Sequence, residues 1–440
     1  MTAEIIIIGG GASGLMAAIE AGKQFVAAGT GAGGRCPVLL LERMDRPGKK
    51  ILATGNGRCN FSNTYMDEAC FRSDTPELVK QVLNQFDQEQ TTEFFKELGI
   101  MVKNRDGYLY PMSGQASSIL DVLLTELERL PVKILTSSPA EKISRIRDGY
   151  QVSIAGGKTY TGKKVIMACG GCAYPKLGSD GSGFWLAKSL GHKIIPPVPA
   201  LTSLYARQDF FKQISGVRAD GRISLYIYNP QEPYSLKSEK PAAWDRGELQ
   251  LTDYGISGIP AFQVSRFASR ALAQGKKVTA VVDFMPDMND GEFFVYLWER
   301  ASIKPHKTPE QFLTGIFNKK LCQLFIKMAK LSREPEVGNF SKKQIHSLVA
   351  VIKGLKIEIT KTGDFDHAQV CAGGVGGREL DGHLQSVLYP GLYFTGEIID
   401  VDGICGGYNL QWAWSSGYVA GHHAAGFPQK DDFVSRPKGQ

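Results

Sequence analysis

Three glycines near the start of the chain have the spacing of a dinucleotide-binding turn. Gly9, Gly11 and Gly14 form the pattern G-x-G-x-x-G directly after the apolar run 5–8 and before the Ala-rich stretch 15–21. In such a turn the first glycine permits a tight bend, the second lets backbone N–H groups approach a pyrophosphate, and the third allows close helix–strand contact. A predicted strand and a predicted helix flank the motif, which is the context that its chemistry requires.

An acidic residue follows the next predicted strand. The apolar run 38–41 leads into Glu42, whose carboxylate can accept the hydroxyls of an adenosine ribose. A plain exposed acid at a strand end is the alternative. The separation from Gly14 exceeds the usual ~20 residues because the glycine-rich segment 29–34 intervenes. No strand precedes that segment, so it is interpreted as an inserted loop and not as a second dinucleotide motif.

A second glycine-rich helix start lies at the other end of the chain. The predicted strand 391–397 ends in Thr-Gly-Glu, and Gly407 shortly precedes a predicted helix from Leu410 with Asn409 as its cap. The N–H groups of residues 410 and 411 would then be free and carry partial positive charge. The N1/C2=O edge of an isoalloxazine needs such charge on reduction. One site at each end of the chain is what FAD, with its two halves, requires.

Two further segments are expected beside such a cofactor. The stretch 43–60 is rich in glycine and cations, so it can wrap an anionic cofactor with N–H donors; a surface loop is the alternative. The predicted strand 164–168 runs into glycines at a place where a side chain would collide with a ligand. Cys169 and Cys172 form a C-x-x-C pair that could shuttle electrons, but the glycines between them favour a packing role.

Composition limits the class of protein. A chain of 440 residues with 43% hydrophobic residues predicts two or three domains with substantial cores. The sequence has no apolar run of ~18 residues, no basic segment before its first apolar run, and no regular framework among its eight cysteines. These features predict a cytoplasmic protein without membrane insertion. The basic segment 291–361 is interpreted as a solvated helix face, with attraction of an anionic substrate as the alternative, and no nucleic-acid motif is recognised.

The pattern of predicted elements changes twice along the chain. Short strands near 225–228, 248–252 and 278–284 indicate a β-rich insert, and 290–353 is helical, with an apolar stripe from Leu313 to Met328 at 3.6-residue spacing. Beyond these, α/β character resumes. The expected domains are an FAD-binding domain of residues 1–195 and 363–440, a β-rich substrate domain of residues 196–289 and 351–362, and a helical subdomain of residues 290–350.

Taken together, these segments resemble the bacterial BaiN/aminoacetone-oxidase-like NAD(P)/FAD-dependent oxidoreductases, whose FAD domain is similar to that of the glutathione-reductase superfamily. The residues that carry the resemblance are 9–14, 53–60, 168–171, 251–258, 372–375 and 391–417. The resemblance implies an α/β fold in which a discontinuous, Rossmann-like FAD domain is interrupted by a β-barrel-like insert and a helical subdomain.

The resemblance also implies roles for residues near the flavin. Glu397 would bind ribityl hydroxyls, Leu410 and Gln411 would approach the pyrimidine ring, and 54–60 would lie along the isoalloxazine. The predicted cofactor-binding residues are Gly9, Gly11, Ala12, Ser13, Gly14, Glu42, Arg43, Lys50, Thr54, Gly55, Gly57, Arg58, Cys59, Asn60, Ala168, Gly170, Gly171, Gly396, Glu397, Gly407, Asn409, Leu410 and Gln411.

Asp253, Tyr254 and Asp402 are the predicted proton donors. Members of the family commonly have His where this chain has Asp253, so Asp253 with Tyr254 must replace it or the substrate differs. Cys405 stands where Thr is frequent, and a thiol there or at Cys59 could perturb the flavin; a small packing residue is the alternative.

The predicted function is an FAD-dependent oxidoreductase that passes hydride or electrons through flavin N5 between NAD(P)H or an organic donor and a small organic substrate. Reduction of a C=C bond in a ring or steroid-like compound is one such reaction. NAD(P)H would be a transient reductant, because no second glycine motif in proper context provides a nicotinamide domain. An aminoacetone-like amine oxidase using O2 and a non-catalytic flavin-binding sensor stay open. The expected partner is a small molecule and not a nucleic acid, no metal site is predicted, and the oligomeric state is undetermined.

Overall fold

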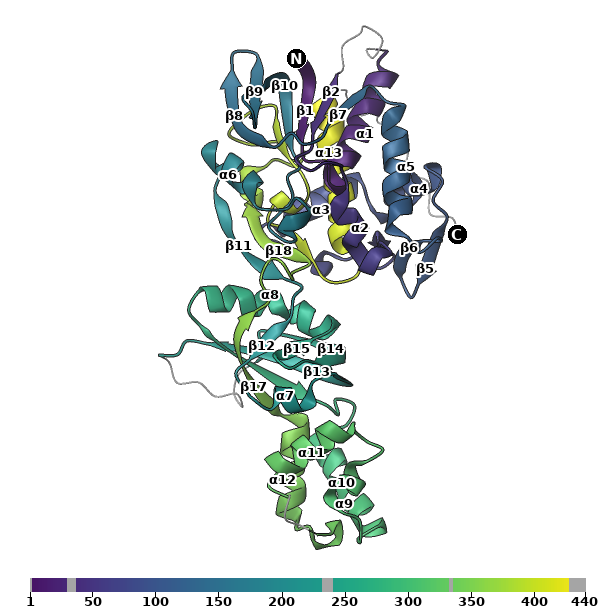
Figure 1. Cartoon of the computed structure of the whole chain (residues 1–440), viewed down its shortest axis with the longest axis vertical. Helices are drawn as coiled ribbons and strands as arrows, with labels where there is room; N and C mark the ends of the chain where they lie inside the picture. Colours follow the sequence, from purple (N-terminus) through teal and green to yellow (C-terminus); the bar gives the residue numbers. More distant parts are fainter. Residues whose placement is uncertain (1, 30–36, 232–239, 332–334, 427–440) are drawn as a thin grey trace. The chain divides into compact units, whose positions relative to one another are not determined.

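A computed structural model describes residues 2–29, 37–231, 240–331 and 335–426 (Figure 1). The chain divides into two compact units, Met1–Pro197 with Gly373–Gln440 and Val198–Ala372. Within the described ranges, no helix has both the length and the apolar character needed to cross a bilayer. The glycine-rich segment interpreted above as an inserted loop lies outside the described residues, apart from Gly29.

The first unit is built on a mainly parallel sheet (Figure 1). The strand order is β7 (Val132–Leu135), β2 (Val38–Leu41), β1 (Thr2–Ile8), β10 (Thr159–Met167), β9 (Gly149–Ile154) and β8 (Ala140–Ile146), with β19 (Leu392–Phe394) also paired to β10. Ile6, Leu39 and Val165 are fully buried in its central strands. Burial on both faces explains why these strands are continuous apolar runs.

Two helices of this unit are in backbone contact. α1 (Ala12–Ala27) follows β1, and α13 (Tyr408–Ala425) is the last described helix. A Cβ added at Gly417 would lie 2.5 Å from the carbonyl oxygen of Ser13, and one at Gly421 would lie 2.5 Å from that of Ala17. The two glycines therefore let the helices approach until a side chain no longer fits between them.

Smaller elements surround the sheet. The helices are α2 (Lys49–Ala53), α3 (Pro76–Gln85), α4 (Gln88–Glu97), α5 (Ala116–Glu128) and α6 (Ser182–Ser189), with 3₁₀ turns η2 (Thr54–Gly57), η3 (Glu68–Cys70), η4 (Pro175–Leu177), η6 (Gly377–Glu379) and η7 (Gly396–Ile398). The short strands are β3 (Ser62–Asn63), β4 (Phe71–Arg72), β5 (Val102–Arg105), β6 (Tyr108–Pro111) and β20 (Asp402–Gly403). The chain passes between the units in β11 (Ile194–Ala200) and β18 (Val370–Val375), which pair with each other.

The second unit contains a closed barrel. Its strands follow the order β12 (Leu204–Ala206), β15 (Gly255–Ser257), β14 (Ala243–Leu251), β13 (Val217–Tyr228), β16 (Lys277–Asp283) and β17 (Leu355–Thr362). In β16 the buried residues Val278, Ala280 and Val282 alternate with more exposed ones, as expected for a strand with one face in a core. The helices α7 (Phe211–Ile214) and α8 (Ile259–Ala273) also belong to this part of the chain.

Helices extend the barrel core of the second unit. They are α9 (Asp290–Ile303), α10 (Pro309–Leu313), α11 (Lys319–Met328) and α12 (Lys342–Lys353), with the turn η5 (Val337–Asn339) before the last. Asn289, Thr308 and Ser341 each close a capping box at the start of a helix. The rings of Phe284 and Phe325 lie 5.4 Å apart, so one apolar cluster joins the barrel to the helices.

The predicted fold class is confirmed: a Rossmann-type domain is interrupted by a barrel and helices. Two details differ from the sequence analysis. The stripe from Leu313 to Met328 is not one helix, because Gly315 has φ 87° and Asn318 caps a new helix. The β-rich stretch also contains α8, which starts beside Pro260, a residue type suited to a first helical turn.

The contact between α1 and α13 predicts an unusual result for Gly421→Ala. In an ordinary helix interior this change stabilises by ~1 kcal/mol, but here the new Cβ meets a backbone oxygen, so we expect a net loss of ~1–2 kcal/mol. Urea unfolding followed by circular dichroism measures the change. Gly376→Ala is the control, since Gly376 has φ −64° and its Cβ would lie 3.8 Å from the nearest atom. A Gly421→Ala protein as stable as the wild type would contradict the contact.

Candidate cofactor site

The glycine turn after β1 has the three predicted roles divided among its glycines. Gly9 has φ 107°, and a Cβ there would lie 2.3 Å from the carbonyl oxygen of Ala168; one at Gly14 would lie 1.9 Å from that of Gly9. At Gly11 an added Cβ would meet nothing within 4 Å. Gly9 and Gly14 are therefore required by close backbone contacts, whereas Gly11 borders open space beside the turn.

The first turn of α1 provides donors at that open space. The hydrogen bonding of the helix begins with the N–H of Leu15, which donates to the carbonyl oxygen of Gly11 at 2.9 Å. The N–H groups of Ala12, Ser13 and Gly14 consequently have no acceptor within the helix. Together with the helix dipole, they form a site suited to a phosphate group.

Glu42 is fixed beside the same turn. It is 7% exposed, and its two carboxylate oxygens accept hydrogen bonds from the N–H groups of Gly10 and Met44, each at 2.7 Å. Each oxygen retains a lone pair, so the carboxylate can still accept ribose hydroxyls. Arg43 follows it and forms an ion pair with Asp180.

Lys50 and Glu397, both predicted to contact the cofactor, form an ion pair with 2.8 Å between Nζ and Oε2. Both side chains are about one-fifth exposed. The turn that carries Glu397 is fixed by α13, because Ser416 accepts from the N–H of Gly396 at 2.9 Å and Trp412 donates to the carbonyl oxygen of Gly396 at 3.1 Å. The pair therefore connects α2 to the end of β19 and to α13.

The segment 54–60 has an unusual backbone. Gly55, Asn56, Gly57 and Cys59 all have φ between 54° and 81°, and 55–58 are exposed. Asn60 is different: its Oδ1 is buried and has no hydrogen-bond partner among the described residues. A Cβ added at Gly407 would lie 3.0 Å from this oxygen, so it is directed at the start of α13. A buried acceptor without a donor is a place where a bound group can supply one.

The start of α13 corrects the sequence analysis. Gly407, with φ 95°, is the N-cap, and the helix begins at Tyr408. The N–H of Gln411, predicted to be free, donates to the carbonyl oxygen of Gly407 at 2.9 Å. The groups without an intrahelical acceptor are those of Tyr408, Asn409 and Leu410. The sequence analysis placed the cap two residues late because asparagine is a good capping residue.

The side chains of Asn409 and Gln411 stabilise the protein around this helix start. Asn409 accepts from the N–H of Gly403 at 2.8 Å and donates to its carbonyl oxygen at 2.9 Å. Gln411 is fully buried; its Oε1 accepts from Ser62 at 2.6 Å, and its Nε2 donates to Thr91 at 2.8 Å. Any contact of Gln411 with a cofactor would therefore involve its backbone.

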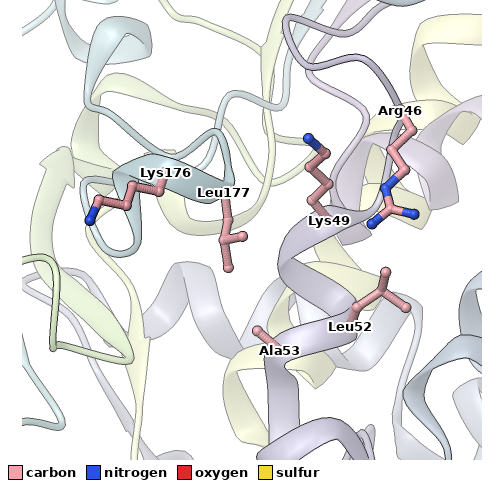
Figure 2. Close-up of a pocket in the computed structure, with 6 residues that line it drawn as sticks. All are labelled: Arg46, Lys49, Leu52, Ala53, Lys176 and Leu177. Atoms are coloured by element: carbon pink, nitrogen blue, oxygen red, sulfur yellow. The ribbon is translucent and has the colours of Figure 1, made fainter.

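A cationic pocket lies in the same unit (Figure 2). It is open and has a volume of about 340 Å³, with the lining residues Arg46, Lys49, Leu52, Ala53, Lys176 and Leu177. α2 and its preceding loop contribute one wall and η4 the other. Lys49 forms an ion pair with Asp45. Three cations beside apolar side chains suit a ligand that carries both phosphate and ring systems.

The cysteines of the predicted site have perturbed thiols. Burial raises the pKa of Cys59 to about 12. Burial also raises that of Cys169 to about 12, assisted by the carboxylates of Glu42 and Asp180, and its thiol faces the carbonyl oxygen of Ile8 at 3.5 Å. Both thiols stay protonated near neutral pH, which favours the packing interpretation over electron transfer.

The predicted proton donors lie in different environments. Asp253 and Tyr254 are exposed in the turn between β14 and β15 of the second unit. Asp402 lies in β20 of the first unit and is 1% exposed. The sequence analysis missed Tyr205, whose ring stacks on that of Tyr254, because their pairing requires the barrel. In the described part of the chain, no group of three or more His, Cys, Asp or Glu is placed to hold a metal ion.

The features of the first unit fit FAD. The donor-rich start of α1 and the open space at Gly11 suit the pyrophosphate. The donor-rich start of α13 and the buried Oδ1 of Asn60 suit a ring that has hydrogen-bond donors. Lys50 and the cations of the pocket suit the negative charge of the pyrophosphate.

Comparison with known proteins identifies several relatives. A family model described as HI0933-like protein Rossmann domain matches residues 3–423. The chain is 43% identical to a 3-dehydro-bile acid Δ(4,6)-reductase of Clostridium scindens over 96% of this chain and 99% of that protein. It is 28% identical to a ribosomal RNA dihydrouridine synthase of Escherichia coli over 94% and 96% of the two chains. Among solved structures, a 3-ketosteroid-Δ4-(5α)-dehydrogenase of Rhodococcus jostii is 15% identical, with a TM-score of 0.45 over 96% of this chain and 97% of that one.

Gly11→Val tests the open space at the glycine turn. The new side chain meets no protein atom within 4 Å of its Cβ, so we expect unfolding of the apoprotein within ~1 kcal/mol of wild type. We also expect loss of FAD, because the valine occupies the space that the pyrophosphate needs. Flavin absorbance per chain after dialysis against FAD measures binding, with Gly376→Ala as the control that retains it. Full flavin occupancy in Gly11→Val would show that the dinucleotide lies elsewhere.

The raised pKa values of Cys59 and Cys169 predict slow alkylation. At pH 8 these thiols are protonated in the folded protein, so iodoacetamide should leave both unmodified. The same reagent in urea should modify them, and peptide mass spectrometry distinguishes the sites. Modification of folded Cys169 as fast as in urea would contradict its raised pKa.

Proposed function

The chain belongs to the HI0933-like family of Rossmann-domain proteins, and from this premise we propose that it reduces a carbon–carbon double bond in a ring of a steroid-like substrate, with FAD bound in the first unit. The proposal depends on one observation: the chain is 43% identical to a 3-dehydro-bile acid Δ(4,6)-reductase over 99% of that protein. The sequence-based assignment to the BaiN-like FAD-dependent oxidoreductases is confirmed by the same matches.

The proposal assigns a role to several of the predicted cofactor segments. The first turn of α1 holds the pyrophosphate, Glu42 the adenosine ribose, and Glu397 the ribityl hydroxyls. The first turn of α13 and Asn60 contact the pyrimidine edge of the ring. FAD supplies the two-electron chemistry when bound. Residues 1–195 and 363–440 form the proposed FAD-binding domain, and the substrate domain comprises residues 196–289 and 351–362 with the helical subdomain 290–350.

Saturating a C=C bond adds a hydride to one carbon and a proton to the other, so the protein must provide an acid. Asp253 and Tyr254 are exposed on one turn and can be reached by a substrate. Asp402 is enclosed and would need a relay to deliver its proton. Asp253 and Tyr254 are therefore the preferred candidates.

The reductant and the substrate class are two parts of the proposal that one experiment can test. NAD(P)H is the proposed transient reductant, and the cytoplasm is the proposed location. The E. coli relative is named for ribosomal RNA dihydrouridine, which is also the product of saturating a ring double bond. An RNA substrate is therefore the competitor to the proposed small molecule.

Anaerobic turnover tests the proposal. The FAD-loaded protein is mixed with NADH or NADPH, then with a 3-oxo-4,6-diene steroid acid, a uridine-containing ribosomal RNA fragment or aminoacetone. We expect the flavin absorbance to be lost with a nicotinamide and restored by the steroid, with product detected by mass spectrometry. Restoration by RNA alone, bleaching by aminoacetone alone, or no change with any compound would contradict the proposal.

Asp253→Asn tests the acid. Loss of the proton donor should lower the rate of steroid reduction by about 10²-fold and leave flavin reduction by the nicotinamide unchanged. Stopped-flow absorbance separates the two steps. Asp220→Asn, an exposed change in β13 of the same unit, is the matched control. Equal rates in the Asp253 and Asp220 variants would exclude Asp253 as the donor.

A further inference from the structure

Two stacked tyrosines on the barrel have no role in the cofactor site. The rings of Tyr205 and Tyr254 lie 4.4 Å apart between centroids at an angle of 20°. The ammonium group of Lys361 lies 4.4 Å from the centroid of the Tyr205 ring. The ring of Tyr205 therefore contacts both the ring of Tyr254 and the ammonium group of Lys361. Such cation and ring contacts fix the orientation of the stack.

The turn that carries Tyr254 is closed by its own hydrogen bonds. The N–H of Thr252 donates to the carbonyl oxygen of Gly255 at 2.9 Å, and the N–H of Gly255 donates to Oγ1 of Thr252 at 3.1 Å. The carbonyl oxygen of Tyr254 accepts from the N–H of Ala206 at 2.9 Å, and its hydroxyl donates to Ser203 at 3.4 Å. Backbone, ring and hydroxyl of Tyr254 are thus all held in place.

Tyr254 nevertheless remains exposed. Its exposed fraction is 36%, although the ring already stacks on Tyr205. Burial and the nearby ring of Tyr254, followed by the carboxylates of Asp364 and Asp253, raise the pKa of Tyr205, so the supporting ring is neutral at physiological pH. A rigid, neutral aromatic surface loses little conformational entropy when a flat ring binds to it.

We propose that Tyr254, supported by Tyr205 and Lys361, is a stacking platform that binds the flat conjugated ring of the substrate. The inference rests on the proposed function, because it assigns the substrate contact for that reaction. Asp253, the proposed acid, precedes Tyr254 in the same turn, and both residues are exposed. A saturated ring is puckered and makes poorer contact, so the platform also favours release of the reduced product.

Ligand binding to the oxidised, FAD-loaded protein tests the platform without turnover. The probes are a 3-oxo-4,6-diene steroid acid and its fully saturated 3-oxo counterpart, titrated calorimetrically. In the wild type we expect the flat diene to bind more tightly. Tyr254→Leu should weaken diene binding about 3- to 10-fold with little effect on the saturated steroid, whereas Tyr254→Phe should stay within about twofold of wild type for both. Tyr205→Leu should weaken diene binding in the same direction.

Tyr296→Leu is the matched control, since Tyr296 is 37% exposed in α9 of the same unit. Thermal unfolding of each variant confirms that the barrel is intact. A Tyr254→Leu protein that folds and keeps the wild-type preference for the diene overturns the platform, as does a wild type that prefers neither steroid. A wild type that binds the diene through Tyr254 but never reduces it overturns the proposed function and leaves the platform standing.

Discussion

The backbone contact between α1 and α13 is the constraint on which the cofactor site depends. Gly417 lies on Ser13 and Gly421 on Ala17, so the two helices run in the same direction in a fixed register. With this register α13 begins about eight residues, or roughly 12 Å, before the level at which α1 begins. Each helix starts at a glycine-rich turn, and both turns present backbone donors. This spacing suits a ligand whose pyrophosphate lies at the start of α1 and whose ring lies at the start of α13.

An ion pair and several hydrogen bonds fix other parts of the cofactor site. The half-buried pair of Lys50 and Glu397 ties α2 to the strand end that α13 stabilises through Ser416 and Trp412. Glu42 is held by the N–H of Gly10, so the acid and the turn form one rigid element. These contacts within the protein fix the groups of the proposed site relative to one another, which lowers the entropic cost of binding.

The features that could be predicted from the sequence are those that depend on residues close together in the chain. Gly9, Gly11 and Gly14 act through the backbone within one turn, so their spacing is informative without knowledge of the partners. Gly417 and Gly421 gave no comparable signal, because their function depends on a helix four hundred residues earlier. The Tyr205–Tyr254 stack is likewise a product of barrel closure. The start of α13 was misplaced because Gly407, whose positive φ glycine adopts readily, is the N-cap instead of the favourable capping residue Asn409.

Titration of the apoprotein with FAD, FMN and ADP tests most directly whether two distant turns hold the two halves of one cofactor. Joining two weakly bound halves makes the second contact intramolecular, so the account predicts one FAD per chain with a Kd at least about 100-fold below that of FMN or ADP. FMN or ADP binding as tightly as FAD, or no binding of FAD, would contradict it.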